Sequence, residues 1–470
     1  MRRNGYGAIA VLLLLCTEAF AGGPLIVGGP QLGQDGQPLK WAAAAMPIKY
    51  RLDPGAISSK YTPTQSRDRV AAMFTKWSGA ADTQLSFQYL GNLLATGAYT
   101  ANADVTTAAQ YDALEGSCYA GTQSPVVFDA NGSILRALGM DDMSIIGMAG
   151  PCAIDDATGN ILTGEIFMNG LFQDGVNTQT NWELTTGEFD EAITHEIGHF
   201  LGLDHSQINL DVLSTFNCAS DTVAGLPLMF PISVCSRTDA GLPILSTDDL
   251  AWISALYPKA TRAQSYGKIS GKIYFSDGMT QMQGVNVIAR RVDDTGTTQN
   301  ESRRVAVSVV SGYRFTTNPG QSVTANYLPC LVASDCPPNG YLGYNIGGSV
   351  LGSRDVGLIG YYQIEVPPGA YTIEVEGIDP GFQWGSSVGP FSIPIPLPGP
   401  PEFWNDEETS TDERTLKSPI NVGAGESVTG VDVILNNTPP RFDQFEDSGG
   451  LFWQLAPLGQ ANCELQEVMA

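Results

Sequence analysis

The sequence predicts an α+β domain, with a mixed twisted sheet and a central helix, followed by a C-terminal all-β sandwich. Two observations support this fold class. Residues 47–258 combine strand-like alternation with helices that carry readable capping signals, whereas residues 266–436 contain only short alternating runs separated by Gly and Pro turns. The chain has 470 residues, 43% of them hydrophobic, so it is long enough to bury more than one core.

The N-terminus is typical of an export signal. Arg2 and Arg3 precede an apolar run from Ala8 to Cys16, and Ala19-Phe20-Ala21 has the small-residue pattern of a cleavage site. The apolar run is too short to cross a bilayer, and no later stretch reaches the ~20 apolar residues that a span requires. We therefore expect a signal peptide at 1–21, a secreted protein without a transmembrane segment, and an extended lead-in at 22–46.

The first elements expected after the lead-in are a strand and a capped helix. Residues 47–52 alternate apolar and polar side chains, as a half-buried strand does. Thr62 and Gln65 have the spacing of a capping box, and the proline between them suits the first helical position. The helix that follows is predicted to bury one stripe of side chains, namely Val70, Phe74 and Trp77.

Two strands and a longer helix are expected next. Residues 144–149 form an apolar run that ends at Gly150-Pro151, and residues 164–169 form the second strand. A helix is predicted to begin near Thr185 or Thr186. Its core-facing side is given by Phe189, Ile193, Ile197 and Phe200.

All three histidines of the chain fall within eleven residues, on this helix and just after it. His195 and His199 are four residues apart and therefore share a helix face. Gly202 tolerates a positive φ, so the chain can turn there and bring His205 back toward the same metal. Three imidazoles leave a fourth position for water, as in a catalytic zinc site. Glu196 is then placed to accept the proton of that water.

The run HEIGHFLGLDHS at 195–206 resembles the metzincin zinc endopeptidases, and it is most similar to their matrixin branch. Residues 228–231, Leu-Met-Phe-Pro, resemble the matrixin Met-turn, which implies that Met229 lies beneath the zinc. Residues 245–258 resemble the last helix of the matrixin catalytic domain, with Ser246 or Thr247 as its cap. The resemblance covers about residues 47–258 and implies one catalytic zinc ion.

The resemblance also implies where a substrate binds. In matrixins the segment corresponding to 144–149 is the edge strand beside the cleft, and substrate backbone pairs with it as a further strand. The residues expected to do so here are Ile145, Ile146, Gly147, Met148 and Ala149.

Other matrixin features are missing from this sequence. A second, structural zinc would need histidines outside the motif, and there are none. The inhibitory cysteine of the matrixin pro-segment is also absent between the signal and the first strand. Position 231 is proline, so no tyrosine ligand is expected there. Structural Ca²⁺ is an open alternative without assigned ligands; residues 127–132 could supply calcium oxygens, although a plain Asx turn is favoured.

Cysteine usage agrees with an oxidising compartment. Besides Cys16 of the signal, the chain has seven cysteines, none of them in a C-x-x-C pair. Pairing by proximity predicts the bridges 118–152, 218–235 and 330–336, and leaves Cys463 over.

The charge balance is strongly acidic, with 49 carboxylates against 24 basic side chains and a net charge of −25. This charge argues against binding to nucleic acid or to anionic membrane surfaces. Most of the carboxylates are expected to form a solvated surface, although some could bind calcium.

The C-terminal half is predicted to be a β-sandwich at 266–436, after a polar linker at 259–265. Strand-like runs lie at 268–275, 284–289, 361–366, 370–375 and 430–435, with an insertion at about 295–358. The pattern resembles the transthyretin-like or carboxypeptidase-regulatory β-sandwich of secreted proteins. Residues 394–413 are expected to be an exposed loop and 437–470 a tail. The sequence does not indicate what this half does.

The leading functional hypothesis is a secreted zinc endopeptidase that acts on protein or peptide substrates. The alternative is an extracellular binding or adhesion protein whose protease site is vestigial or highly restricted. Intact Glu196 argues against that alternative, because decay usually removes the base or a ligand first. A metal-dependent hydrolase acting on other bonds is a third hypothesis, disfavoured by the similarity of the motif to peptidases.

Overall fold

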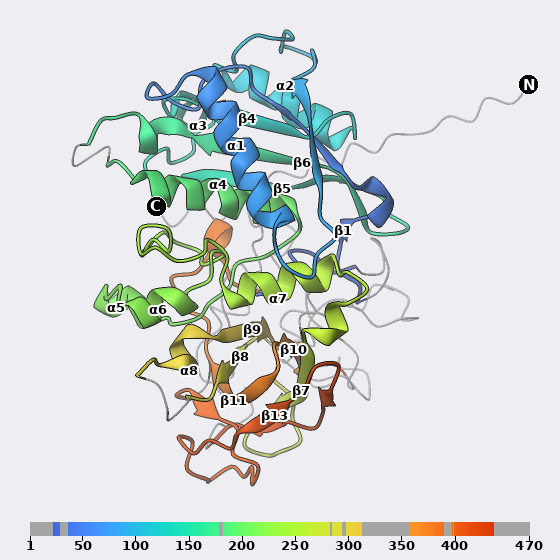
Figure 1. Cartoon of the computed structure of the whole chain (residues 1–470), viewed down its shortest axis with the longest axis vertical. Coiled ribbons are helices and arrows are strands. Elements are labelled where there is room, and N and C mark those ends of the chain that lie inside the picture. The colour runs from blue at the N-terminus through green and yellow to red at the C-terminus, as the bar shows by residue number, and fades with distance from the viewer. Residues whose placement is uncertain are drawn as a thin grey trace, which may run out of the picture.

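The computed structural model in Figure 1 describes residues 22–28, 36–177, 182–282, 284–293, 298–312, 358, 360–389, 397 and 399–436. The expected signal peptide, the expected tail and most of the expected insertion lie outside these residues. The elements up to about residue 200 occupy the upper part of Figure 1, and the strands of the C-terminal half occupy the lower part.

A six-stranded mixed sheet forms the centre of the N-terminal half. Five strands run parallel in the order β1-β6-β4-β2-β3, and β5 pairs antiparallel with β6. β5 has no second partner among the described strands, so it is an edge strand of the sheet. The bounds are β1 Lys40–Trp41, β2 Ile48–Leu52, β3 Phe87–Asn92, β4 Pro125–Asp129, β5 Gly147–Ile154 and β6 Asn160–Asn169.

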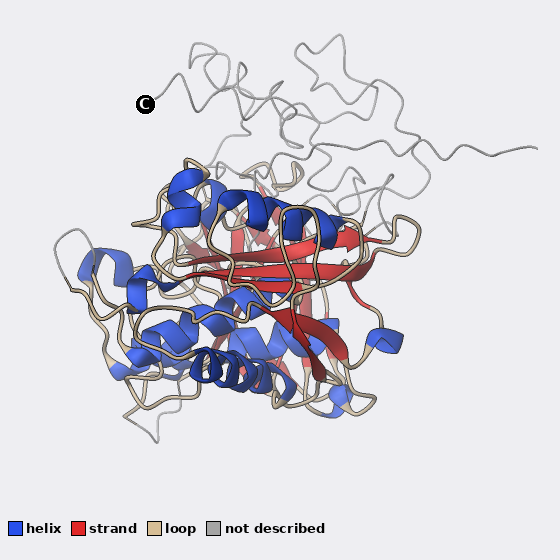
Figure 2. Cartoon of the chain, turned by 90° about the horizontal axis from the view of Figure 1, so that it is seen from above, coloured by secondary structure: helices blue, strands red, loops and turns tan. Residues whose placement is uncertain are grey.

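Helices cover both faces of this sheet, and Figure 2 shows them on either side of the strands. Alternate residues of β4 show how the faces divide: Val126 and Phe128 join the core beneath α1 (Pro63–Ser78) and α4 (Thr186–Phe200). Val127 instead packs with residues of α2 (Ala108–Tyr119) and α3 (Ser133–Ala137). Side chains of a strand alternate between its two faces, so successive residues of β4 pack into two separate cores.

The helix starts agree with the capping signals of the sequence. Thr62, Thr185 and Ser246 each form a capping box with the residue three positions later, at the starts of α1, α4 and α7 (Thr247–Leu256). The predicted core stripes of α1 and α4 are all buried. Thr107 forms a fourth box, with Gln110, at the start of α2, which the sequence analysis did not recognise.

The edge strand differs from its predicted extent. β5 begins at Gly147, so Ile145 and Ile146 lie before it. The side chain of Asn169 donates to the carbonyl of Ile145 at 2.9 Å, which holds that residue in a turn. The strand also continues past Pro151 to Ile154, with shifts of register. An edge strand tolerates proline because its outer side needs no ladder hydrogen bond.

The C-terminal half contains a four-stranded and a five-stranded sheet. Buried side chains of the two sheets, such as Ile364 and Ile373, belong to one core. Short strands separated by Gly and Pro turns predict an antiparallel sandwich, but β14 and β15 both run parallel to β7. The bounds are β7 Gly267–Tyr274, β8 Asn286–Arg291, β9 Ala306–Val310, β10 Tyr361–Val366, β11 Gly369–Glu376, β12 Glu402–Phe403, β13 Ile420–Val422, β14 Ser427–Val428 and β15 Val433–Ile434.

Several segments expected to be irregular are structured. The lead-in contributes β1, and the expected linker contains a 3-10 helix, η3 (Arg262–Gln264), with Arg262 buried. The expected insertion contains β9, whose five residues are all buried. The expected exposed loop contains Glu402, which is only 2% exposed. Short apolar or polar runs of this kind do not reveal their partners in sequence.

The remaining helical segments are short. They are η1 Ala43–Ala45, η2 Gly170–Gln173, α5 Val212–Thr215, α6 Ser220–Gly225, α8 Glu301–Arg304 and η7 Trp384–Ser386. In the part of the chain described, no helix combines the length and the hydropathy that a bilayer crossing requires.

Two of the three predicted disulfides are confirmed. Cys118 bonds to Cys152, and Cys218 bonds to Cys235. The predicted pair Cys330 and Cys336, and also Cys463, lie outside the described residues. At the turn 127–132, Asn131 accepts the amide of Ser133 at 3.1 Å, as the favoured Asx turn predicts.

The two halves of the chain share a tightly bonded contact. Trp252 of α7 donates its indole N–H to the carbonyl of Ser308 in β9 at 2.8 Å. The amide of Ser308 donates in turn to Asp248 of α7 at 2.8 Å. Arg262 of η3 is paired with Glu365 of β10. The C-terminal sheets are thus fastened to the N-terminal half beside its last helix.

Candidate metal centre

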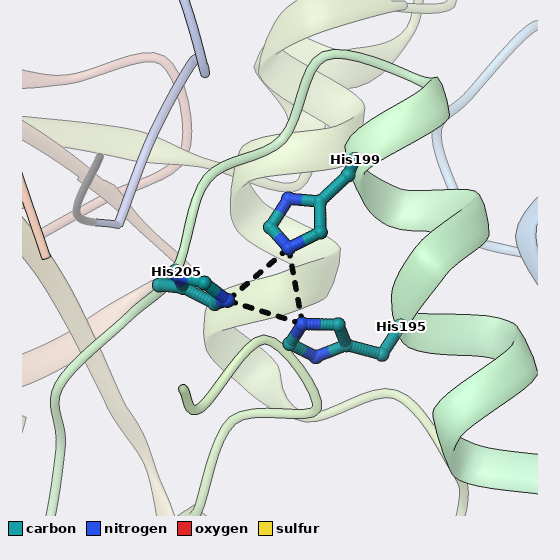
Figure 3. A group of neighbouring side chains, drawn as sticks. All are labelled: His195, His199 and His205. Carbon is teal, nitrogen blue, oxygen red and sulfur yellow. Dashed lines mark hydrogen bonds between the residues drawn. The ribbon is translucent and has the colours of Figure 1, made fainter. Parts of the chain in front are cut away.

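The three histidines converge at the end of α4 (Figure 3). His195 and His199 project from one face of the helix, one turn apart. The helix ends at Phe200, and Gly202 has φ +84°, which lets the chain leave the helix and return. His205 follows on the returning segment. These three residues, as predicted, form a group that could hold a metal ion.

The rings approach through one nitrogen each. The Nε2 atom of His199 lies 3.0 Å from that of His195 and 3.2 Å from that of His205. The Nε2 atoms of His195 and His205 are also 3.2 Å apart. The dashed lines in Figure 3 trace this nearly equilateral triangle.

The other ring nitrogen of each histidine fixes the tautomer. Nδ1 of His195 lies 2.8 Å from the carbonyl oxygen of Leu228, and Nδ1 of His199 lies 2.9 Å from that of Leu203. Nδ1 of His205 lies 2.9 Å from the carbonyl oxygen of Ser387. A carbonyl oxygen only accepts, so each Nδ1 carries the proton.

Three unprotonated Nε2 atoms therefore face one another. In neutral rings of this tautomer, Nε2 carries no hydrogen. The short Nε2–Nε2 distances are therefore not hydrogen bonds, and they bring three lone pairs together. Such an arrangement is repulsive by itself and becomes favourable around a cation. The donor set and its orientation fit a bound metal ion.

The surroundings keep these rings uncharged. Burial lowers the pKa of His195, and burial together with the neighbouring His195 lowers the pKa of His199 to about 3. Burial and the two other rings hold the pKa of His205 well below its usual value. Neutral imidazole is the form that ligates metal.

A carboxylate on α7 supports the first ligand. Asp249 accepts the backbone amides of Leu228 at 2.9 Å and Met229 at 3.2 Å. It thereby fixes the loop whose Leu228 carbonyl orients His195. Asp249 also closes the capping box of its own helix with Ser246. This contact joins positions 20 and 21 residues apart, so the sequence did not predict it.

Met229, which was predicted to lie beneath the zinc, packs against α4 at Gly198. It is buried, and a Cβ added to Gly198 would lie 2.4 Å from its Sδ atom. Because residue 198 is glycine, the sulfur of Met229 can approach the helix between His195 and His199. The carbonyl of Met229 also accepts the amide of Ser206, next to His205, at 2.8 Å.

The side chain of Glu196 extends from α4 toward the edge strand β5. Its side chain is buried, and burial raises its pKa to about 8. A Cβ added to Gly147, the first residue of β5, would lie 2.8 Å from Oε1 of Glu196 and 2.7 Å from its Cγ. The missing side chain at position 147 thus makes room for the carboxylate.

The C-terminal half also reaches the site, through residues 377–389, here named the 377–389 segment. The carbonyl of Ser387 orients His205, and Ser387 is fully buried. The ring of Phe382 meets that of Phe230 edge-on at 5.4 Å. Gln207 donates to the carbonyl of Gly377 at 3.0 Å. Nothing in the sequence pairs a histidine with a carbonyl 182 residues later, so this contact was not foreseen.

Of the predicted site residues, the structure brings together Glu196, Met229, Gly147 and the three histidines. Met148 and Ala149 follow Gly147 along β5, whereas Ile145 and Ile146 precede the strand. No protein-family profile matches the chain, and no curated protein matches it in sequence.

Proposed function

We propose that the chain is a secreted zinc-dependent endopeptidase of the matrixin-like metzincin type. The observation that carries the proposal is the convergence of three Nε2 lone pairs within 3.0 to 3.2 Å of one another. A tetrahedral zinc ion with Zn–N distances near 2.0 Å separates its nitrogen ligands by about 3.3 Å. The fit supports zinc over larger cations, which also prefer oxygen ligands.

The chemistry follows from the donor set and its neighbour. Bound zinc would supply Lewis acidity to a water molecule and to a scissile carbonyl. Glu196 is the group that takes up the proton as water attacks, and it returns the proton to the leaving amine. Its side chain follows the ligand His195 in sequence and is buried beside Gly147, and burial raises its pKa to about 8. This environment suits a group that must both accept and release a proton.

The edge strand supports a peptide as substrate. β5 is half-buried along its whole length and has no second partner among the described strands. An extended peptide could add to that edge through main-chain hydrogen bonds, which do not depend on its side chains. Gly147 would bring this edge directly beside Glu196.

Export supports the same proposal. The two disulfides fit an oxidising compartment, and the N-terminal residues have the pattern of a signal peptide.

The test compares wild type with Glu196→Gln on casein and gelatin, with and without a chelator. We expect the variant to retain one zinc per chain and to lose cleavage by a factor of about 10² to 10⁴. Glu191→Gln is the matched control on the same helix, because that carboxylate instead accepts from Ser236 and Thr238. Cleavage by Glu196→Gln at the wild-type rate would reject the assigned base.

Zinc content measured by elemental analysis accompanies these assays. If the wild type binds no zinc, the assignment of the histidines fails. If it binds zinc and cleaves no tested protein in a chelator-sensitive manner, the proposal fails in favour of a binding protein with a vestigial site.

A further inference from the structure

A second group of metal-ligand side chains lies in the C-terminal half, far along the chain from the histidines. Glu402, Glu408 and Asp412 each offer a carboxylate oxygen, and these oxygens lie within 4.8 Å of one another. Glu402 belongs to β12, and the other two lie on the loop that follows it. We name these three residues the acidic cluster.

Backbone groups hold the acidic cluster against the strand β15. Oε2 of Glu408 accepts the amide of Ile434 at 2.9 Å, and Oε2 of Glu402 accepts the amide of Asn436 at 2.8 Å. The side-chain nitrogen of Asn436 donates to Oδ1 of Asp412 at 2.8 Å. The carboxylates are therefore fixed in direction before any ligand arrives.

Two buried oxygens beside these contacts have no partner. Glu402 is only 2% exposed, and its Oε1 accepts no hydrogen bond. Oδ1 of Asn436 is also buried without a hydrogen-bond partner, although the same amide group donates to Asp412. A buried acceptor without a hydrogen bond destabilises a fold, so two of them beside three carboxylates call for a positive partner.

The protein itself supplies little positive charge at this place. Within the described residues, no Lys or Arg forms an ion pair with Glu402, Glu408 or Asp412. Burial and the neighbouring carboxylates raise the pKa of Glu402 to about 7, and Arg414 lowers it only in small part. The pKa of Glu408 is raised to about 7, mainly by burial. Without a cation, Glu402 and Glu408 are therefore only partly ionised at neutral pH.

We propose that the acidic cluster, together with Oδ1 of Asn436, binds a calcium ion that fastens the 402–412 loop to β15. All four side chains offer hard oxygen atoms, which Ca²⁺ prefers and which Zn²⁺ takes less readily. Two oxygens on opposite sides of one Ca²⁺ are separated by at most about 4.6 to 5.2 Å, given Ca–O distances of 2.3–2.6 Å. The spacing of the cluster lies within that limit. Water completes the six to eight ligands.

The test uses the full chain in the Glu196→Gln background, which prevents self-cleavage if the proposed function holds. Chelating-resin-treated buffer supplemented with zinc keeps the histidine site loaded, and CaCl₂ is titrated by calorimetry. We expect one equivalent of Ca²⁺ to bind with a Kd below about 1 mM and to raise the Tm. Tb³⁺ luminescence excited through Trp404, two residues after Glu402 in the sequence, reports the same site.

The decisive variant is Glu402→Gln. It keeps the size of the side chain and an acceptor for the Asn436 amide, but turns an N–H₂ group toward the cluster. We expect it to lose Ca²⁺ binding and the Tb³⁺ signal, and to have a higher Tm than wild type in calcium-free buffer because the charge crowding is relieved. Glu407→Gln is the control, an exposed carboxylate on the same loop.

The outcomes distinguish a cation-binding site from carboxylates that have only a structural role. No calorimetric heat and no Tb³⁺ signal from the parent protein up to 5 mM titrant, on the order of the weakest extracellular sites, would overturn the proposal. Equal loss of binding in Glu402→Gln and Glu407→Gln would also overturn it, because the ion would then be held by general surface charge. The histidine proposal is independent of either result, since zinc content is measured in every variant.

Discussion

Adding one methyl group at Gly147 should displace the proposed catalytic base. A Cβ at this position would lie 2.7 Å from Cγ, 2.8 Å from Oε1 and 2.9 Å from Cδ of Glu196, whereas ordinary contacts begin at 3.4 Å. The Glu196 side chain must therefore withdraw by about 0.5 to 0.7 Å in Gly147→Ala, and a misplacement near 1 Å can cost about 10²-fold in rate. We expect kcat to fall by about 10- to 100-fold, or about 1.4 to 2.7 kcal/mol in activation free energy.

The same strand offers a matched control. A Cβ added to Gly150 would meet no atom within 4 Å, and neither glycine has a positive φ, so Gly150→Ala should keep the wild-type kcat. Both variants are assayed on one peptide taken from a mapped cleavage site in casein, with zinc content and Tm measured alongside. If Gly147→Ala holds zinc and turns over as fast as Gly150→Ala, then Glu196 does not act from the position that the structure gives it.

Two further predictions concern stability. Gly198→Ala should lower the free energy of unfolding, measured in urea, by about 1–3 kcal/mol, because its Cβ would overlap the sulfur of Met229. Gly116→Ala, at an open helical position, should raise that free energy by up to about 1 kcal/mol. Equal effects of the two substitutions would contradict the packing described. The second concerns pH: burial raises the folded-state pKa of Glu402 and Glu408 to about 7, above about 4.3 in an unfolded chain, so both bind protons more tightly when folded. The stability that the two protonated side chains contribute is complete below pH ~4.3 and is lost as the pH rises to about 7. The Tm of the calcium-free protein should therefore fall more between pH 5 and 8 than the Tm of the calcium-loaded protein. Parallel curves of Tm against pH for the two forms would contradict this expectation.

The sequence predicted the elements whose signals are local. The capping box of Thr62 and Gln65 located the start of α1, because the residues that satisfy the first backbone amides are close in sequence. The starts expected near Thr185 or Thr186, and at Ser246 or Thr247, agree with the boxes that Thr185 and Ser246 form. The three histidines that could hold a metal ion were also predictable from the sequence, since one helix and one glycine turn bring them together. Pairing by proximity also gave both described disulfides.

What the sequence did not predict depends on partners far along the chain. β1 is two residues long and exists because β6 pairs with it. Glu402 follows a proline-rich run and was expected to be exposed, yet it pairs with Val375 of β11 and accepts a hydrogen bond from the amide of Asn436. The first residue of β5 was misplaced because the turn before it is held by Asn169, more than twenty residues away. Burial and long-range pairing decide such cases, and periodicity does not report them.

The hydrogen bond from His205 to the carbonyl of Ser387 means that both halves of the protein contribute to the candidate metal centre. A fragment ending at Tyr257 or Pro258 would carry every imidazole and the carboxylate Glu196, but only two of the three acceptors that hold the rings in register. The third ring could then rotate or change tautomer, at a cost in metal affinity of the order that loss of an outer hydrogen-bond partner brings, about 10- to 100-fold. The acceptor of the third ring thus lies 182 residues after His205, so the bracing of all three rings requires the C-terminal half.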